Sequence, residues 1–215
     1  MSNHAKFAPS AAERWLKCGK SIKIAQYYPE TTTSAANEGT KKHAIAEMHL
    51  LNGTEPGDEK LKVYTNAVRN VAVDGELLVE HKVIIVPELC EGTLDAAVIN
   101  DGWVNNFDLK YGKSPVHATD NPQQMLYGLG LVREYELPKD FPITLTIVQP
   151  NATSGWPVKN WETDVGHLLK FYEKVKRAID VALGPDPKAV AGSHCYWCPG
   201  KMNCKEYLKY AGKNK

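Results

Sequence analysis

The sequence has neither an excess of charge nor a long apolar run. Its 215 residues include 26 Lys and Arg against 25 Asp and Glu, a formal net charge of +1 at pH 7. A basic surface over the whole molecule is therefore excluded, and any contact with nucleic acid must be local. No apolar stretch approaches the roughly 20 residues that a bilayer span needs, and residues 1–9 contain no signal-peptide core. We expect a cytoplasmic protein without a membrane partner.

Cysteine is also scarce, with five residues in the chain. Cytoplasmic thiols stay reduced, so these cysteines are expected to be ligands or free thiols rather than a disulfide framework. The length and the 43% hydrophobic content suffice for one α/β (α+β) domain with a full core. We expect a single domain over residues 1–215, with its core at about 35–183 and cysteine-bearing elements at about 10–28 and 190–212.

Capping and turn signals divide the chain into elements. Ser10 and Glu13 have the form of a capping box, and Asn52-Gly53 and Asp74-Gly75 are typical of helix ends. Helices are expected at about 10–28 (with Cys18 inside it or at a break), 35–51, 58–73, 120–135 and 162–183. Strands are expected at about 77–86, 92–100, 103–110 and 143–148, and a loop at 150–161.

Asp101-Gly102 is typical of a two-residue turn between the second and third strands. If these two residues form its centre, Asp95 faces Asp108 across the hairpin. Opposed side chains lie about 4.5–5.5 Å apart at Cβ, and like charges there repel, so a divalent cation is the natural compensation. Alternation along the strand places Lys110 on the same face as Asp108. The hairpin therefore predicts a D…DxK group on one surface of the sheet.

This group suits hydrolysis of a phosphodiester, because carboxylate-bound Mg²⁺ or Mn²⁺ neutralises the scissile phosphate and activates water. Asp95 and Asp108 are the predicted ligands, and Lys110 is expected to orient the attacking water and stabilise negative charge. Glu38 and His43 lie about 140° apart on the helix before the strands, so one of them is expected to face the ion. We favour His43, since imidazole suits Mn²⁺.

The order of four motifs resembles that of the RecB-like branch of the PD-(D/E)xK nuclease superfamily. The motifs are His43, Gly92-Thr93-Leu94-Asp95, Asp108-Leu109-Lys110 and Gln123-Gln124-Met125-Leu126-Tyr127. The resemblance implies that Gln123 and Tyr127 join the active site. It also implies a restriction-endonuclease-like core, a mixed β-sheet flanked by helices. Leu94 stands where the superfamily has its eponymous Pro, which leaves the ligands unchanged.

A C-x2-C-x5-C run near the end of the chain is typical of a bound metal or cluster. The run consists of Cys195, Cys198 and Cys204. Cys18, Cys90 and His194 are candidates for the fourth ligand. Cys90 or His194 favours tetrahedral Zn²⁺, whereas Cys18 favours a 4Fe-4S cluster. The pattern resembles the iron-sulfur nucleases of the CRISPR-associated and AddB type, which implies that Cys18 completes a 4Fe-4S cluster; Zn²⁺ is the alternative.

These features predict a metal-dependent PD-(D/E)xK-type deoxyribonuclease. An exonuclease that acts on DNA ends or single-stranded DNA is favoured, because the sequence contains no base-reading motif. Compact members of this branch resemble phage and mobile-element proteins, which implies a role beside a recombination partner. The sequence does not decide between a monomer and an oligomer. The alternative is a non-catalytic nucleic-acid-binding module whose tail holds zinc or a cluster.

Overall fold

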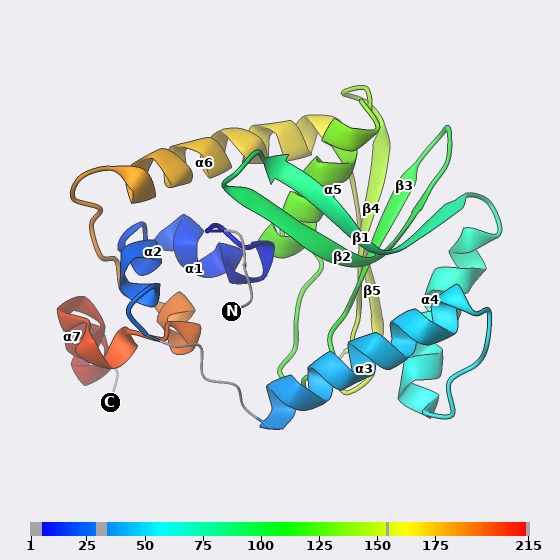
Figure 1. Cartoon of the computed structure of the whole chain (residues 1–215), viewed down its shortest axis with the longest axis horizontal. Coiled ribbons are helices and arrows are strands. Elements are labelled where there is room, and N and C mark those ends of the chain that lie inside the picture. The colour runs from blue at the N-terminus through cyan, green and yellow to red at the C-terminus, as the bar shows by residue number, and fades with distance from the viewer. Residues whose placement is uncertain (1–5, 29–33, 154, 214–215) are drawn as a thin grey trace.

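Five strands form one mixed sheet with helices on both faces in the computed structural model of the chain (Figure 1), which describes residues 6–28, 34–153 and 155–213. The strands, in their order across the sheet, are β1 (Glu76–Val86), β2 (Cys90–Ile99), β3 (Val104–Leu109), β4 (Pro142–Val148) and β5 (Val158–Asp164). β3 and β4 are parallel, and the other neighbouring pairs are antiparallel. The predicted mixed sheet flanked by helices is confirmed.

The helices are distributed over both faces of this sheet and over one end of the molecule. They are α1 (Ala12–Lys17), α2 (Lys20–Ala25), α3 (Ser34–Leu51), α4 (Glu59–Ala72), α5 (Pro122–Glu134), α6 (Val165–Leu183) and α7 (Lys205–Lys213), with the 3₁₀ helices η1 (Pro9–Ala11), η2 (Ser193–Trp197) and η3 (Lys201–Asn203). α5 and α6 cover one face, and α3 and α4 cover the other (Figure 1). In the described part of the chain, no helix is both long and apolar enough to span a membrane.

The two ends of the chain meet beside α6, as expected. α1 and α2 lie next to η2 and α7 in Figure 1. The Arg14 guanidinium donates to the carbonyl oxygen of Trp197 at 3.1 Å, and the backbone N–H of Val190 lies 3.4 Å from Sγ of Cys18. Residues almost a full chain length apart in sequence are thus in direct contact.

The helix predicted over 10–28 is divided in two. Cys18 has extended dihedrals (φ −141°, ψ 94°) and separates α1 from α2. The predicted capping box is wrong, because Ser10 lies within η1 and α1 begins after Ala11 without a side-chain cap. Side chains do cap two later helices: Asp58 accepts from the N–H of Lys60 at the start of α4, and Asn121 caps α5.

The predicted loop at 150–161 and helix at 162–183 miss a strand that lies between them. Residues 158–164 form strand β5, and α6 begins only at Val165, where Asp164 caps it by accepting from His167 N–H at 2.7 Å. β5 is an edge strand of mostly polar residues, with no residue in it fully buried. It therefore lacks the alternation of apolar and polar residues that would have predicted a strand.

The hairpin between β2 and β3 has the predicted register. Its paired residues run from Ile99 opposite Val104 to Ala96 opposite Phe107. Asp95 and Asp108 are the next positions along the two strands.

The regular alternation of side chains between the two faces of the sheet is interrupted in β1 at Glu80 and in β2 at Asp95. These two occupy opposite positions, because the flanking pairs are Val79 with Ala96 and His81 with Leu94. Before Glu80 the odd-numbered Leu77 and Val79 pack on the side of α3 and α4, whereas after it the odd-numbered Val83 and Ile85 pack on the side of α5 and α6. Glu80 has a φ of +47°, which is uncommon for a residue other than glycine. Such strain inside a strand is characteristic of functional positions.

Candidate active site

Asp95 is held between helix α3 and strand β3. Its Oδ1 lies 3.1 Å from Nδ1 of His43, and its Oδ2 accepts a hydrogen bond from the backbone N–H of Leu109 at 2.7 Å. Burial lowers the pKa of His43, but the hydrogen bond and the negative charge of Asp95 outweigh burial, so the pKa lies above its ordinary value. The structure thus brings His43 onto Asp95, as the sequence predicted.

Asp108 is a buried carboxylate, 2% exposed. The ammonium of Lys110 lies 3.0 Å from its Oδ1 and 2.8 Å from its Oδ2, which confirms that the two side chains share a face. The contact with Oδ2 does not have hydrogen-bond geometry, and this oxygen has no hydrogen-bond partner among the described residues. Burial raises the pKa of Asp108, the charge of Lys110 opposes that rise and the charge of Asp95 adds to it. The Lys110 ammonium supplies the compensating charge for this carboxylate, and Oδ2 keeps an acceptor position that no hydrogen bond fills.

Helix α5 adds Gln123 and Tyr127 to this group. The Lys110 ammonium donates to Oε1 of Gln123 at 2.9 Å, so the lysine lies between the aspartate and the helix. A side-chain hydrogen bond joins Gln123 to Tyr127, a residue that is 6% exposed and whose pKa is raised by burial. The four residues Asp108, Lys110, Gln123 and Tyr127 form a continuous chain of contacts.

Glu80 belongs to the site and was missed from the sequence. Ligand atoms of His43, Glu80 and Asp95 all lie within 4.8 Å of one another. Burial raises the pKa of Glu80 to about 7, and the charges of Asp95 and Glu47 add to that rise. The signal was the β1–β2 pairing, which sets Glu80 opposite Asp95, but the turn between these strands contains no motif that fixes its register.

The predicted ligand set is only partly assembled in the structure. His43 and Asp95 are grouped with Glu80, whereas Asp108 lies outside that group beside Lys110. Glu38 is exposed near the start of α3.

The carboxylate of Asp58 binds the sequence neighbours of two site residues. Lys42, next to His43, pairs with the carboxylate of Asp58, and the hydroxyl of Tyr111, next to Lys110, donates to the same carboxylate at 3.0 Å. The lysine hydrogen bond lowers the pKa of Asp58 to about 2. Asp58 thereby joins α3, the start of α4 and the end of β3.

The four cysteines of the predicted cluster, Cys18, Cys195, Cys198 and Cys204, line one cavity together with His194. Cys90 lies elsewhere, at the start of β2 and buried in the core, where burial raises its pKa to about 12. No three of the cysteine sulfurs, all in the described part of the chain, lie within 4.8 Å of one another. Tetrahedral zinc, with Zn–S bonds of about 2.3 Å, requires sulfurs roughly 3.8 Å apart.

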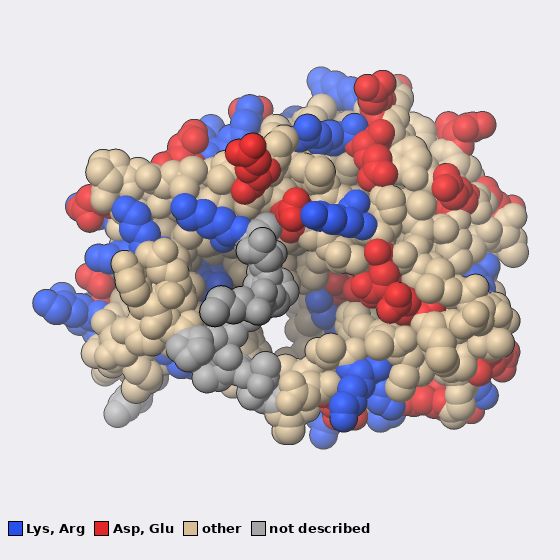
Figure 2. All heavy atoms as spheres, in the orientation of Figure 1, with Lys and Arg blue, Asp and Glu red and all other residues tan. Residues whose placement is uncertain are grey.

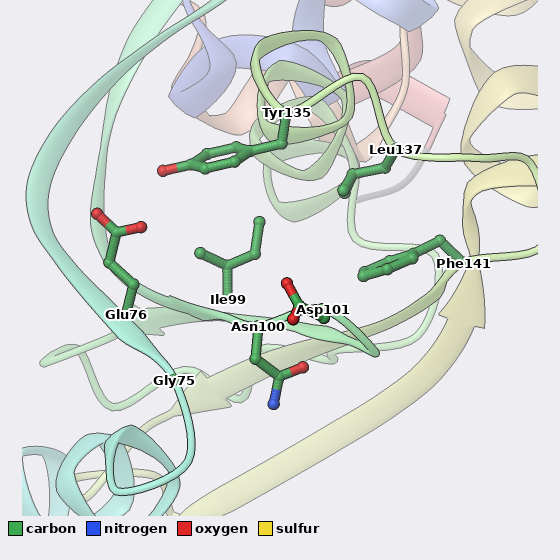
Figure 3. Close-up of a pocket in the computed structure, with 8 residues that line it drawn as sticks. All are labelled: Gly75, Glu76, Ile99, Asn100, Asp101, Tyr135, Leu137 and Phe141. Carbon is green, nitrogen blue, oxygen red and sulfur yellow. The ribbon is translucent and has the colours of Figure 1, made fainter.

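A separate pocket of about 510 Å³ lies near the Asp101-Gly102 turn (Figure 3). Tyr135, Leu137 and Phe141 form its apolar wall, and the carboxylates of Glu76 and Asp101 point toward its space (Figure 3). None of the predicted site residues lines this pocket. The chemistry-bearing side chains are therefore concentrated between α3, the sheet and α5.

One family model, described as a protein of unknown function (DUF2800), matches residues 4–66 and 58–214 of the chain. Two solved structures are also similar. The crystal structure of SSO0001 gives a TM-score of 0.44 at 12% identity, covering 97% of this chain and 88% of that one. The crystal structure of a "Putative exonuclease" from Eubacterium rectale gives a TM-score of 0.44 at 9% identity, covering 88% of this chain and 86% of that one. At these TM-scores neither likeness bears on the chemistry of the site.

Proposed function

The chain belongs to the DUF2800 family, and from its site we propose that it is a metal-dependent DNA nuclease of the PD-(D/E)xK type. One observation carries this proposal. Asp95 and Asp108 directly adjoin Ala96 and Phe107, the last paired residues of the β2–β3 hairpin, and each is held by a basic side chain, His43 on the first and Lys110 on the second. Two acids and a lysine in this relation provide both a cation site and a fixed positive charge for a phosphodiester.

The donor set fits Mg²⁺ or Mn²⁺. Asp95 and Asp108 offer carboxylate oxygens and His43 an imidazole, a combination that suits Mn²⁺ and is acceptable to Mg²⁺. The Oδ2 atom of Asp108 accepts no hydrogen bond among the described residues, and the Lys110 ammonium lies beside it at 2.8 Å. When bound, the ion would neutralise charge on the scissile phosphate and make a water molecule more acidic.

The residues around the acids have separate roles in this proposal. Lys110 is held between Asp108 and Gln123, at 2.8–3.0 Å from their oxygens, so its ammonium is fixed rather than mobile. It would orient the attacking water and stabilise the negative charge that develops on the phosphate oxygens. Gln123 and Tyr127 would keep the ammonium in place through their own contact. Hydrolysis then adds water across one phosphorus–oxygen bond, and the departing oxygen takes up a proton.

The substrate that we propose is single-stranded DNA or a DNA end, cut as by an exonuclease. Figure 2 shows basic and acidic side chains interspersed over one face of the molecule, in line with a net charge of +1. Such a face supports short, local contacts with phosphates better than a long contact with duplex DNA.

We further propose that Cys18, Cys195, Cys198 and Cys204 hold a 4Fe-4S cluster that joins the two ends of the chain. The four cysteines line one cavity, and four thiolates of which one is distant in sequence suit such a cluster. Purified protein should be brown, with broad visible absorbance, and Cys198→Ser should lose the colour. A colourless protein with one zinc per chain would overturn this assignment.

The nuclease proposal is tested with end-labelled single-stranded DNA and Mn²⁺. The wild-type protein should degrade the DNA, and Asp108→Ala should reduce the rate by at least 100-fold, on the order of the loss of a main catalytic group, while DNA binding persists. Asp140→Asn, which removes an exposed charge far from the site in sequence, is the matched control and should cut normally. Undiminished cleavage by Asp108→Ala would refute the assignment.

A further inference from the structure

We propose that the loops that follow β3 and β4 bind single-stranded nucleic acid, with Trp156 stacking on a base and Lys113 contacting the adjoining phosphate. The first loop comprises residues 110–121, and the described parts of the second are 149–153 and 155–157. The inference rests on the proposed nuclease only for the direction in which the strand reaches the acids, because binding itself requires neither cleavage nor a metal ion.

The two loops leave the sheet at the same edge, beside the proposed active site. β3 and β4 are parallel, and Leu109 at the end of the first is paired with Val148 at the end of the second. The backbone N–H of Lys110 donates to the carbonyl oxygen of Val148 at 2.8 Å. In open α/β sheets, ligands bind beyond the carboxyl ends of parallel strands. The loop after β4 therefore begins next to the lysine of the proposed site.

Gln149 joins the two loops. It is 1% exposed, and its Nε2 donates to the carbonyl oxygens of Gly112 and Ser114 at 2.9 and 2.7 Å. Its own backbone N–H donates to the carbonyl oxygen of Pro157 at 2.6 Å. Trp156 directly precedes Pro157, so its backbone adjoins a point that a buried side chain connects to the other loop.

Trp156 is the most exposed large apolar side chain among the described residues, at 82%. Its ring makes no hydrogen bond or ring contact in the described part of the chain. An indole in water leaves a large apolar surface uncovered, and a base has a flat face that can cover it. Stacking of bases on such side chains is the common means of holding a single strand without reading its sequence.

The charge around the two loops is positive. Residues 109–119 and 141–161 contain no Asp or Glu, although the chain has 25 of them, and they do contain Lys110, Lys113 and Lys159. The ammonium of Lys113 is exposed and has no ion pair with any described residue. A region that lacks acids and has an unpaired lysine complements a phosphate backbone.

The other end of the same strands carries the opposite charge. Glu76 lies at the start of β1 and Asp101 just before β3, and both carboxylates point into the pocket of Figure 3. A phosphate backbone is repelled from that end and attracted to the loops after β3 and β4.

The combination of one exposed indole and one free ammonium selects a single strand. Bases in a duplex are already stacked on one another, so they offer no face to Trp156, whereas each base of a single strand does. A protein partner would require a wider apolar patch than one side chain. The occupant that fits is therefore a short stretch of single-stranded nucleic acid.

The test is the binding of a fluorescein-labelled oligothymidylate in EDTA, measured by fluorescence anisotropy. Trp156→Ala should lose at least about fivefold in affinity, the lower end of the effect of one base–aromatic stack. Tyr27→Ala is the control, because it removes an aromatic side chain of similar exposure (76%) just after α2, and it should bind as the wild type does. Both variants should keep the wild-type melting temperature, since both side chains are exposed. Undiminished affinity in Trp156→Ala would overturn the proposal.

An abasic oligonucleotide of the same length separates stacking from charge. It has phosphates but no bases, so wild type and Trp156→Ala should bind it equally weakly. Lys113→Gln should weaken the binding of both oligonucleotides and reduce the slope of log affinity against log salt by about 0.7, as expected for one phosphate contact. Weaker binding of the abasic strand by Trp156→Ala, or an unchanged slope in Lys113→Gln, would contradict the assigned roles.

DNA cleavage with Mn²⁺, measured on the same samples, separates this inference from the nuclease proposal. A protein that binds the oligothymidylate through Trp156 but cuts no DNA supports the strand site and overturns the nuclease. A protein that cuts DNA, and whose Trp156→Ala variant binds and cuts as the wild type does, supports the nuclease and overturns the strand site.

Discussion

Replacing Glu80 by Gln is expected to stabilise the metal-free protein above neutral pH. Burial, Asp95 and Glu47 raise the pKa of Glu80 from an ordinary value of 4.5 to about 7. The native state therefore holds a proton on Glu80 more tightly than the unfolded chain does. The stability that this proton contributes is fully present below pH 4.5 and is lost as the pH rises through about 7. Glutamine is uncharged at every pH and avoids that loss.

The size of the effect follows from the difference between the two pKa values. Without screening by solvent, a rise in pKa from 4.5 to about 7 corresponds to about 3 kcal/mol of unfolding free energy, at 1.36 kcal/mol for each pKa unit. Glu80 is partly exposed, so screening by solvent reduces the gain to about 1–2 kcal/mol. For a chain of this size that gain is a rise in melting temperature of roughly 3–6 °C.

The assay is thermal unfolding in EDTA at pH 5 and pH 8.5, with Glu162→Gln as the control. Glu80→Gln should exceed the wild type clearly at pH 8.5 and only slightly at pH 5, while the control stays close to the wild type at both. In saturating Mn²⁺ the order should reverse, because the variant has lost a ligand. A variant that melts below the wild type at pH 8.5 in EDTA would refute the electrostatic reasoning.

Two further predictions concern packing and positioning. Asp58→Asn keeps the cap of α4 but loses the charge that holds Lys42, so urea unfolding should show a loss of about 1 kcal/mol; no change would show that the ion pair is dispensable. Gly130→Ala places a Cβ 2.5 Å from Cβ of Val83, which forces α5 away from β1 and should cost about 1–3 kcal/mol. Gly39→Ala is its control, because nothing lies within 4 Å of that site on α3, and it should stabilise by up to about 1 kcal/mol.

Local chemistry explains why the hairpin was predictable. A two-residue Asp-Gly turn allows one register, and alternation then places every side chain on a definite face. The structure has that register from Ile99 to Ala96, and Lys110 contacts Asp108 as expected. α3 and α4 were predicted within one residue at each end, because Asp58 and Asn52-Gly53 are strong boundary signals.

The features that were missed depend on tertiary structure. β5 is a polar edge strand whose identity comes from pairing with β4, not from its own sequence. The role of Glu80 depends on a local distortion of the sheet, at which the side chains of β1 and β2 change the face to which they point. No periodic pattern in the sequence encodes this change. The break at Cys18 reflects contact with the end of the chain, since Cys18 faces Val190.

The most direct test of the proposed chemistry is the cleavage of end-labelled single-stranded DNA by wild type and by Lys110→Gln in the same Mn²⁺ solution. Glutamine removes the fixed positive charge but leaves the carboxylates of Asp95 and Asp108 free to bind the ion. We predict cleavage by the wild type, none in EDTA, and a loss of at least 100-fold in the variant, on the order expected when a main stabilising group is removed, although it still binds Mn²⁺. A wild-type protein that leaves DNA intact, or a variant that cuts at the wild-type rate, would contradict the account.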